Sequence, residues 1–214
     1  LTPIKLSIQH IRRAREDRRT DFDDILVKNV DAILAEIERL AGIAQSFSKY
    51  GAPGGEGEVP VGQVYLHEIV DDVMALYGGG SSTTVLFEQE ITPGLPPVRA
   101  RTSELKEVLI NLLENARVAV TKGGIVRILG NQINGRVVLA VVDDGAGIPE
   151  ELLPRIFEPQ FSTRSTGAGL GLPIVKRIVE SWGGTVEVDS TTGQGTTVSV
   201  FLSLWTEPLD TEVG

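Results

Sequence analysis

Apolar residues recur at helical spacing through the first fifty positions of the chain. Ile4, Ile8 and Ile11 share one face and predict a helix from Leu1 to about Arg15. From about Asp21 to Tyr50 the apolar positions are separated alternately by four and three residues, which is the heptad pattern of a coiled coil or helical bundle. This apolar seam consists of Leu26, Val30, Ile33, Ile37, Leu40, Ala44 and Phe47.

Residues 1–50 are therefore predicted to form a helical hairpin. Two helices alone bury little apolar surface, so we expect a homodimer in which two hairpins form a four-helix bundle. The alternative is that the seam packs against the rest of its own chain. Residues 51–60, with the sequence GAPGGEGEVP, have the composition of a linker.

Residues 61–204 alternate between helical and strand patterns and predict a second domain. Thr102 or Ser103 is the expected N-cap of its central helix. Helices combined with mostly antiparallel strands imply an α/β two-layer sandwich, so the fold class of the whole chain is α+β, with residues 205–214 as a flexible tail. The predicted helices are His67–Tyr77, Ser103–Ala119 and Leu170–Trp182, and the predicted extended segments are Val85–Glu90, Leu95–Val98, Ile125–Leu129, Val137–Val142, Thr185–Val188 and Thr197–Leu202.

Charge separates the two parts of the chain, whose formal net charge is −9. Residues 1–50 carry nine Lys and Arg against eight Asp and Glu, whereas residues 51–214 carry eleven against twenty-one. An acidic second domain disfavours nucleic acid as a partner, because nucleic-acid phosphates require a basic surface. It can still hold a nucleotide if a divalent cation neutralises the phosphates locally.

Composition also bounds the setting of the protein. Cysteine is absent, which excludes disulfides and thiolate metal sites. No apolar run approaches the roughly 18–20 residues of a membrane span, so we expect these residues to make no membrane contact. Because the chain starts at Leu1 in mid-pattern, we expect a fragment that is cytoplasmic or is the cytoplasmic part of a membrane-anchored protein.

The candidate chemistry lies between Val141 and Ile174. An apolar run ends in Asp143-Asp144-Gly145-Ala146-Gly147, and a carboxylate at a strand end can accept a hydrogen bond from an amino group. Gly145 and Gly147 have no Cβ, so a flat ring could approach the backbone there. Further glycines precede a helix, whose free N–H groups suit phosphate. One segment thus offers a site for each end of a purine nucleotide.

Three companion motifs make this signal specific. Upstream lies NLLENA at 111–116, between the glycine clusters lies FEPQFSTR at 157–164, and downstream lies GQGT at 193–196. In this order the set resembles the N, G1, F, G2 and G3 boxes of the sensor histidine kinases, which belong to a wider superfamily with the gyrase, Hsp90 and MutL ATPases. The resemblance covers nearly the whole chain, and its short lid resembles the nitrogen-regulation class.

The resemblance implies roles for residues of the nucleotide site. Asn115 matches the residue that binds Mg²⁺ through its side-chain oxygen. Asn111 stands where the gyrase-like ATPases have a glutamate that activates water, and a carboxamide cannot act as a general base. Asp143, rather than the more exposed Asp144, matches the aspartate that accepts from the adenine amino group, and Thr196 matches the threonine that supports this contact.

The segment from Phe157 to Gly169 resembles the lid over the nucleotide. Phe157 and Phe161 are expected to anchor it to the core. Ser162, Thr163 and Arg164 could reach phosphate oxygens, and Arg164 is the expected catalytic partner of the γ-phosphate. The expected phosphate-wrapping backbone is Gly167, Gly169, Leu170 and Gly171.

The resemblance implies a two-component kinase that binds Mg²⁺-ATP. The γ-phosphoryl group would pass to a histidine upstream of residue 1 and then to an aspartate of a response-regulator receiver domain. His10 and His67 do not match the acceptor and are expected to be structural or surface residues. The alternatives are an ATPase of the gyrase/Hsp90 type, a non-catalytic dimeric signalling scaffold, and a serine-directed kinase of the anti-sigma type.

Overall fold

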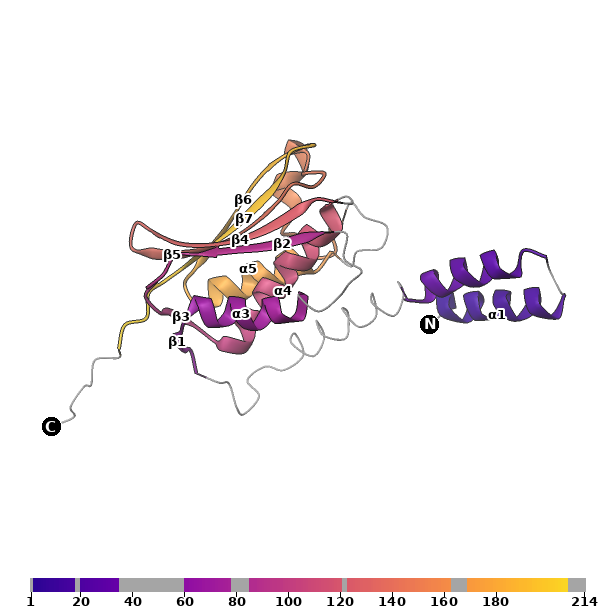
Figure 1. Cartoon of the computed structure of the whole chain (residues 1–214), viewed down its shortest axis with the longest axis horizontal. Coiled ribbons are helices and arrows are strands. Elements are labelled where there is room, and N and C mark those ends of the chain that lie inside the picture. The colour runs from indigo at the N-terminus through magenta and orange to yellow at the C-terminus, as the bar shows by residue number, and fades with distance from the viewer. Residues whose placement is uncertain are drawn as a thin grey trace. The chain divides into compact units, whose positions relative to one another are not determined.

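The computed structural model describes residues 2–17, 20–34, 60–77, 85–120, 123–162 and 169–207. These residues fall into two compact units, which are treated separately (Figure 1). The first unit contains residues 1–56 and 160–170, and the second contains 57–159 and 171–214. Most of the predicted linker, the seam residues Ile37, Leu40, Ala44 and Phe47, and residues 208–214 of the predicted tail lie outside the described residues.

Two helices form the N-terminal part of the first unit. Helix α1 (Thr2–Glu16) matches the prediction, and a second helix is described over residues 22–34. Ala14 is 2% exposed, so its small side chain is buried within this unit. Large apolar side chains nevertheless remain exposed on this pair of helices, and they are Leu6, Ile8, Val27, Val30 and Leu34.

The second unit is built on a mixed five-stranded sheet. The strand order is β2-β4-β5-β7-β6, in which β2 pairs with β4 in parallel and every other pair is antiparallel. A separate antiparallel pair joins β1 to β3. The strands are β1 (Gly62–Val64), β2 (Leu86–Ile91), β3 (Val98–Ala100), β4 (Ile125–Ile133), β5 (Arg136–Asp143), β6 (Thr185–Thr191) and β7 (Gly195–Leu202).

Three helices cover one face of this sheet (Figure 1). They are α3 (Leu66–Tyr77), α4 (Thr102–Ala119) and α5 (Gly171–Ser181), and a short 3-10 helix, η1 (Glu150–Arg155), lies between β5 and α5 in the chain. The core forms between helices and sheet because the apolar stripe of α4 faces the alternate apolar positions of β4, β5 and β7. Fully buried members include Leu109, Leu113, Ile128, Leu139 and Val200. The prediction of a helical hairpin followed by an α/β two-layer sandwich is confirmed.

The ends of several elements differ from the sequence prediction. Helix α4 begins one residue early, with Arg101 as its N-cap and no side-chain capping hydrogen bond, so the prediction of Thr102 or Ser103 as the cap is wrong. Instead Glu104 in the first turn pairs with Arg101 at 3.2 Å and accepts from Trp182 Nε1 at 3.0 Å. The Glu104 carboxylate therefore holds the start of α4 against Trp182, which directly follows α5.

Tight turns and extended segments complete the unit. Asn134 and Gly135 both have positive φ and form the two-residue turn between β4 and β5, which is the backbone that such a hairpin requires. The extended edge expected at Leu95–Val98 lies slightly later, because β3 runs over Val98–Ala100. Within the part of the chain that the structure describes, no helix has both the length and the apolar character needed to cross a bilayer.

Candidate functional site

Two carboxamides on α4 converge on the first residue of α5. Asn111 and Asn115 are four residues apart and so share a face of the helix. A Cβ built on Gly171 would lie 3.2 Å from Asn115 Nδ2 and 3.5 Å from the Oδ1 atoms of both asparagines. The structure therefore brings together three residues that the sequence analysis assigned to the site.

The two asparagines are held differently. Asn111 Nδ2 donates to the carbonyl oxygen of Glu107 at 2.9 Å, which fixes the carboxamide and leaves its oxygen toward Gly171. Asn115 Nδ2 is buried and has no hydrogen-bond partner within the described part of the chain. A buried polar group without a partner is costly, so the Asn115 carboxamide is placed where a bound group would complete it.

Glu114, next to Asn115, is engaged elsewhere. It accepts from Tyr77 Oη at 2.9 Å, and Arg117 donates to it through Nε at 2.9 Å and Nη2 at 2.7 Å. Burial, followed by the hydrogen bond and the charge of Glu114, raises the pKa of Tyr77 above its usual value near 10. Sequence reasoning missed this Tyr77–Glu114–Arg117 cluster.

Asp143 and Thr196 form the second part of the candidate site. They are directly paired across β5 and β7, and they are the buried polar residues of the part that the structure describes, at 7% and 8% exposed. Asp143 Oδ1 accepts from the Gly145 N–H at 2.9 Å. Asp144 is exposed, and its Oδ1 accepts from the Ile125 N–H at 2.9 Å, which ties the start of β4 to the end of β5.

The glycine loop after β5 is enclosed by protein backbone. Ala146 N–H donates to Ala119 O at 3.1 Å, and Ala146 O accepts from Gly193 N–H at 2.7 Å. A Cβ on Gly145 would lie 2.5 Å from Ala119 O, and a Cβ on Gly147, which has φ of +67°, would overlap Thr191 O. These glycines were expected to let a flat ring approach the backbone, but the nearest backbone atoms that exclude a Cβ belong to Ala119 of α4 and to Thr191 at the end of β6.

Ser190 on β6 connects this loop to Thr196. Its Oγ accepts from the Ile148 N–H at 2.8 Å, donates to Gly195 O at 2.9 Å and lies 2.9 Å from Thr196 Oγ1. Sequence reasoning missed this residue. The available signal was its position in the strand, because Ser190 continues the alternate positions occupied by Val186 and Val188.

The predicted lid is described only in part, at its two ends. Thr163, Arg164 and Gly167 lie outside the described residues. Gly169 O accepts from Gln160 N–H at 3.0 Å, and a Cβ on Gly169 would lie 2.6 Å from Phe161 O, so the two ends of the segment meet. Ser162 is exposed and Leu170 is half-buried. Segment 160–170 belongs to the first unit and is described by itself.

The residue that anchors the segment before the lid differs from the expectation. Ile156, at 8% exposed, enters the core, whereas Phe157 and Phe161 are only half-buried. Lys176 Nζ of α5 lies 5.1 Å from the centroid of the Phe157 ring, which is within the range of a cation–π contact. Phe157 is therefore held against α5 by its ring face rather than by insertion into the core.

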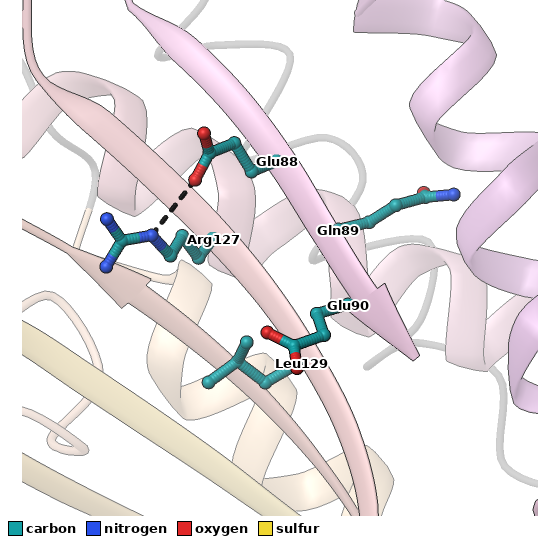
Figure 2. A pocket seen from close by; sticks show the side chains of 5 residues that line it. All are labelled: Glu88, Gln89, Glu90, Arg127 and Leu129. Atoms are coloured by element: carbon teal, nitrogen blue, oxygen red, sulfur yellow. Dashed lines mark hydrogen bonds and ion pairs between the residues drawn. The ribbon is translucent and has the colours of Figure 1, made fainter. Parts of the chain in front are cut away.

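A depression along the edge strand β2 and its neighbour β4 contains none of these residues. Figure 2 shows it lined by Glu88, Gln89, Glu90, Arg127 and Leu129 of β2 and β4. Its main interaction is the ion pair between Arg127 Nε and Glu88 Oε2 at 3.0 Å, and both side chains are about half exposed. An exposed ion pair of this kind contributes little. We therefore place the candidate site at Asn111, Asn115, Asp143, Thr196 and Gly171.

Two curated proteins resemble this chain over nearly its whole length. The chain is 29% identical over 210 residues to the nitrogen regulation protein NtrY of Azorhizobium caulinodans, covering 94% of this chain and 27% of that protein. It is 30% identical over 210 residues to sporulation kinase C of Bacillus subtilis, covering 95% of this chain and 46% of that protein. The chain thus spans less than half the length of these two curated relatives.

Solved structures show the same fold. The catalytic domain of histidine kinase ThkA superimposes with a TM-score of 0.62 at 29% identity, over 68% of this chain and 97% of that one. A structure of ThkA in complex with the response regulator protein TrrA gives a TM-score of 0.71 at 24% identity, over 95% of this chain and 58% of that one, and shows likeness of fold.

The family match covers the site itself. Residues 100–206 match the family described as histidine kinase-, DNA gyrase B- and HSP90-like ATPases. This range contains α4 with both asparagines, the glycine loop, α5 and the β6–β7 turn. Membership in an ATPase family implies that the nucleotide is ATP. The chain belongs to the family of histidine kinase-, DNA gyrase B- and HSP90-like ATPases.

Proposed function

We propose that this chain is the ATP-binding catalytic region of a two-component sensor histidine kinase. The observation that carries the proposal is the convergence of the Asn111 and Asn115 carboxamides on Gly171 at the start of α5. A site with two carboxamides there can position a nucleotide but has no base at Asn111 to activate water. Such a site is suited to passing the γ-phosphoryl group to a protein side chain.

The residues present fit a magnesium ion held together with the nucleotide. Mg²⁺ prefers oxygen ligands and is usually held by few protein groups together with phosphates and water. In the described ranges no group of three or more His, Cys, Asp or Glu could hold a metal. The carboxamide oxygen of Asn115, 3.5 Å from the position of a Cβ on Gly171, would supply the protein ligand. The ion would neutralise charge on the phosphates, which suits an acidic domain.

The chain's own residues would bind and orient the nucleotide. The Asp143 carboxylate would accept from the adenine amino group, with Thr196 beside it. The free N–H groups at the start of α5 would face the phosphates. Ser162, Thr163 and Arg164, with the backbone of Gly167, Gly169 and Leu170, remain the proposed phosphate contacts of the lid.

The proposed reaction is phosphoryl transfer to histidine. A nitrogen of a histidine upstream of residue 1 attacks the γ-phosphorus in line, the bond from that phosphorus to the bridging β–γ oxygen breaks, and ADP leaves. The imidazole proton is lost to solvent. Neither histidine of this chain is proposed as the acceptor. His10 is exposed and lacks the neighbouring acid of the family box, and His67 is an exposed side chain in the first turn of α3 in the second unit.

The helical hairpin supports a partner proposal. Leu6, Ile8, Val27 and Leu34 are each more than half exposed, and such a surface is costly in water. We propose that it is covered by a second copy of the chain in a four-helix bundle. The phosphohistidine would serve a response-regulator receiver domain, the kind of protein with which ThkA was solved. The proposed location is the cytoplasm, either free or as part of a membrane-anchored sensor.

The decisive experiment uses the chain extended at its N-terminus to include the expected acceptor box. It is incubated with Mg²⁺ and γ-labelled ATP beside an Asp143→Asn variant. Acid-labile, base-stable label on the wild-type protein, absent from the variant, is the expected result. Free phosphate without labelled protein would instead favour an ATPase of the gyrase/Hsp90 type. A wild-type protein that yields neither product would favour the non-catalytic scaffold.

A further inference from the structure

Three polar residues form one row across the sheet at the candidate adenine site. The β5–β7 register pairs Asp143 with Thr196, and the β6–β7 register pairs Thr196 with Ser190. Residues paired directly across neighbouring strands point to the same face. The row therefore runs from the carboxylate of Asp143 through the hydroxyl of Thr196 to the hydroxyl of Ser190.

Counting protons in this row fixes the direction of each hydrogen bond. A serine hydroxyl has one proton and two lone pairs. Gly195 O has no proton, so Ser190 must donate its only proton there, across 2.9 Å. One lone pair of Ser190 accepts from Ile148 N–H at 2.8 Å. The remaining 2.9 Å contact with Thr196 Oγ1 can then only be a bond in which Thr196 donates.

The Thr196 hydroxyl is left with lone pairs alone. Its proton is committed to Ser190, so any further group must donate to it. An ionised Asp143 beside it is likewise an acceptor only. The two buried polar side chains of the row thus present acceptors together. An amino group with two protons matches this arrangement, whereas a carbonyl oxygen in the same place would face lone pairs.

We propose that Ser190 is a positioning residue that locks Thr196 as a hydrogen-bond acceptor and thereby strengthens the preference of the site for adenine over a 6-oxo purine. The inference rests on the proposed binding of ATP at Asp143. Ser190 would act only through Thr196, directly or through a water held by it. Adenine carries an amino group at the position where guanine carries a carbonyl oxygen, so the lock favours ATP over GTP.

A purely structural role for Ser190 is the competing explanation. Through Ile148 and Gly195 its hydroxyl also ties the glycine loop to the β6–β7 turn. Loosening that loop would weaken every nucleotide alike. The lock differs because it changes the ratio of ATP affinity to GTP affinity, and because its effect requires the Thr196 hydroxyl.

The test measures Mg²⁺-ATP and Mg²⁺-GTP dissociation constants by calorimetry for four proteins. These are wild type, Ser190→Ala, Thr196→Val and the double variant. With Ser190→Ala, Thr196 regains a free proton, and the affinity ratio should fall about tenfold, the value of one correctly oriented hydrogen bond. Thr196→Val should lower the ratio similarly, and Ser190→Ala should add no further change in that background. Ser190→Thr keeps a hydroxyl, so it should retain the wild-type ratio of ATP affinity to GTP affinity.

Three outcomes would overturn the proposal. Equal losses of ATP and GTP affinity in Ser190→Ala would mean a structural role. An unchanged ratio in Thr196→Val would remove the residue through which Ser190 acts, and this holds even if Ser190→Ala fails to fold. A further fall of the ratio in the double variant would mean a route that bypasses Thr196. Failure of the proposed function itself is separate, because wild type would then bind neither nucleotide.

Discussion

The carboxamide of Asn115 and the backbone of Gly171 are in close contact, with 3.2 Å between Asn115 Nδ2 and the position of a Cβ on Gly171. This contact joins the C-terminal part of α4 to the first residue of α5. Asn115 and Gly171 are more than fifty residues apart in the chain, yet the fold places them side by side at the proposed phosphate site.

Gly171→Ala should weaken nucleotide binding more than it weakens the fold. The added methyl group is tight against Asn115, so the carboxamide must move, and we expect ATP affinity to fall about tenfold, the loss of one well-placed polar contact. Gly171 does not need positive φ, and alanine favours a helix, so the melting temperature should change little. Calorimetry and thermal unfolding measure the two effects. Gly62→Ala is the control, since its Cβ would have no atom nearer than Pro60 O at 4.0 Å.

Removing the proposed metal ligand should remove the effect of the metal. In wild type, chelation of Mg²⁺ is expected to lower ATP affinity clearly, because the phosphates lose their neutralising cation. In Asn115→Ala the affinity in Mg²⁺ should already be low, and chelation should change it little. Asn115→Asp keeps an oxygen ligand and should retain metal dependence. If Asn115→Ala responds to chelation as wild type does, the metal is held without Asn115.

Comparison of alanine variants at Gly147 and Gly135 distinguishes the cost of backbone strain from the cost of steric overlap. Both have positive φ, at +67° and +76°, but only a Cβ on Gly147 would meet other atoms, the carbonyl group of Thr191 first. Gly135→Ala should lower the free energy of unfolding by about 1 kcal/mol, because alanine is strained in the left-handed backbone conformation. Alanine at Gly147 should cost about 2 kcal/mol more, because the β6–β7 turn must shift. Urea unfolding of both variants gives the difference, and equal costs would mean that the loop is not enclosed as described.

Substitutions at the two neighbouring aspartates should have different effects, on ATP affinity at Asp143 and on stability at Asp144. Asp143→Asn is expected to lower ATP affinity at least tenfold, because an amide can present a donor to the adenine amino group. Asp144→Asn should leave affinity unchanged and reduce stability by about 1 kcal/mol through the weakened bond from Ile125 N–H at 2.9 Å. Calorimetry and urea unfolding on both variants check this. The reverse pattern would move the adenine contact to Asp144.

Tyr77 should make stability depend on alkaline pH. Its pKa is raised in the folded protein, first by burial and then by Glu114, so the folded state favours the protonated phenol. This contribution is complete below the ordinary tyrosine pKa near 10 and is lost as pH rises toward the folded value. The free energy of unfolding of wild type should exceed that of Tyr77→Phe by about 1 kcal/mol at pH 8. This difference in stability should shrink above pH ~10. Urea unfolding from pH 8 to 11 follows it, and a constant difference would show that Tyr77 does not titrate as described.

The helices and strands followed from local sequence, whereas the ends of elements did not. The 3.6-residue and two-residue periodicities identify α4, β4 and β5 because burial of one face dominates there. The cap of α4 was predicted wrongly because Glu104 is drawn to Arg101 and to the distant Trp182. Strand β1 has three residues, too few for a periodic pattern.

The site shows the same division between motif and long-range contact. The asparagines and Asp143 stand in recognisable motifs, and the structure brings Asn111 and Asn115 to Gly171. The surroundings of Gly147 depend on Thr191, which is distant in sequence, so no local pattern reveals them. Ser190 was missed for a related reason, since a serine in a strand gains meaning only once Ile148, Gly195 and Thr196 are beside it.

The measurement that tests the account most directly is a titration of this chain with ATP in Mg²⁺, with free phosphate followed in the same sample. We predict saturable binding at one site per chain, loss of that binding in Asp143→Asn, and no sustained release of phosphate, because the Asn111 carboxamide cannot activate water. Absence of binding, or steady phosphate release by wild type that Asp143→Asn abolishes, would contradict a site built to hold ATP for transfer to a histidine.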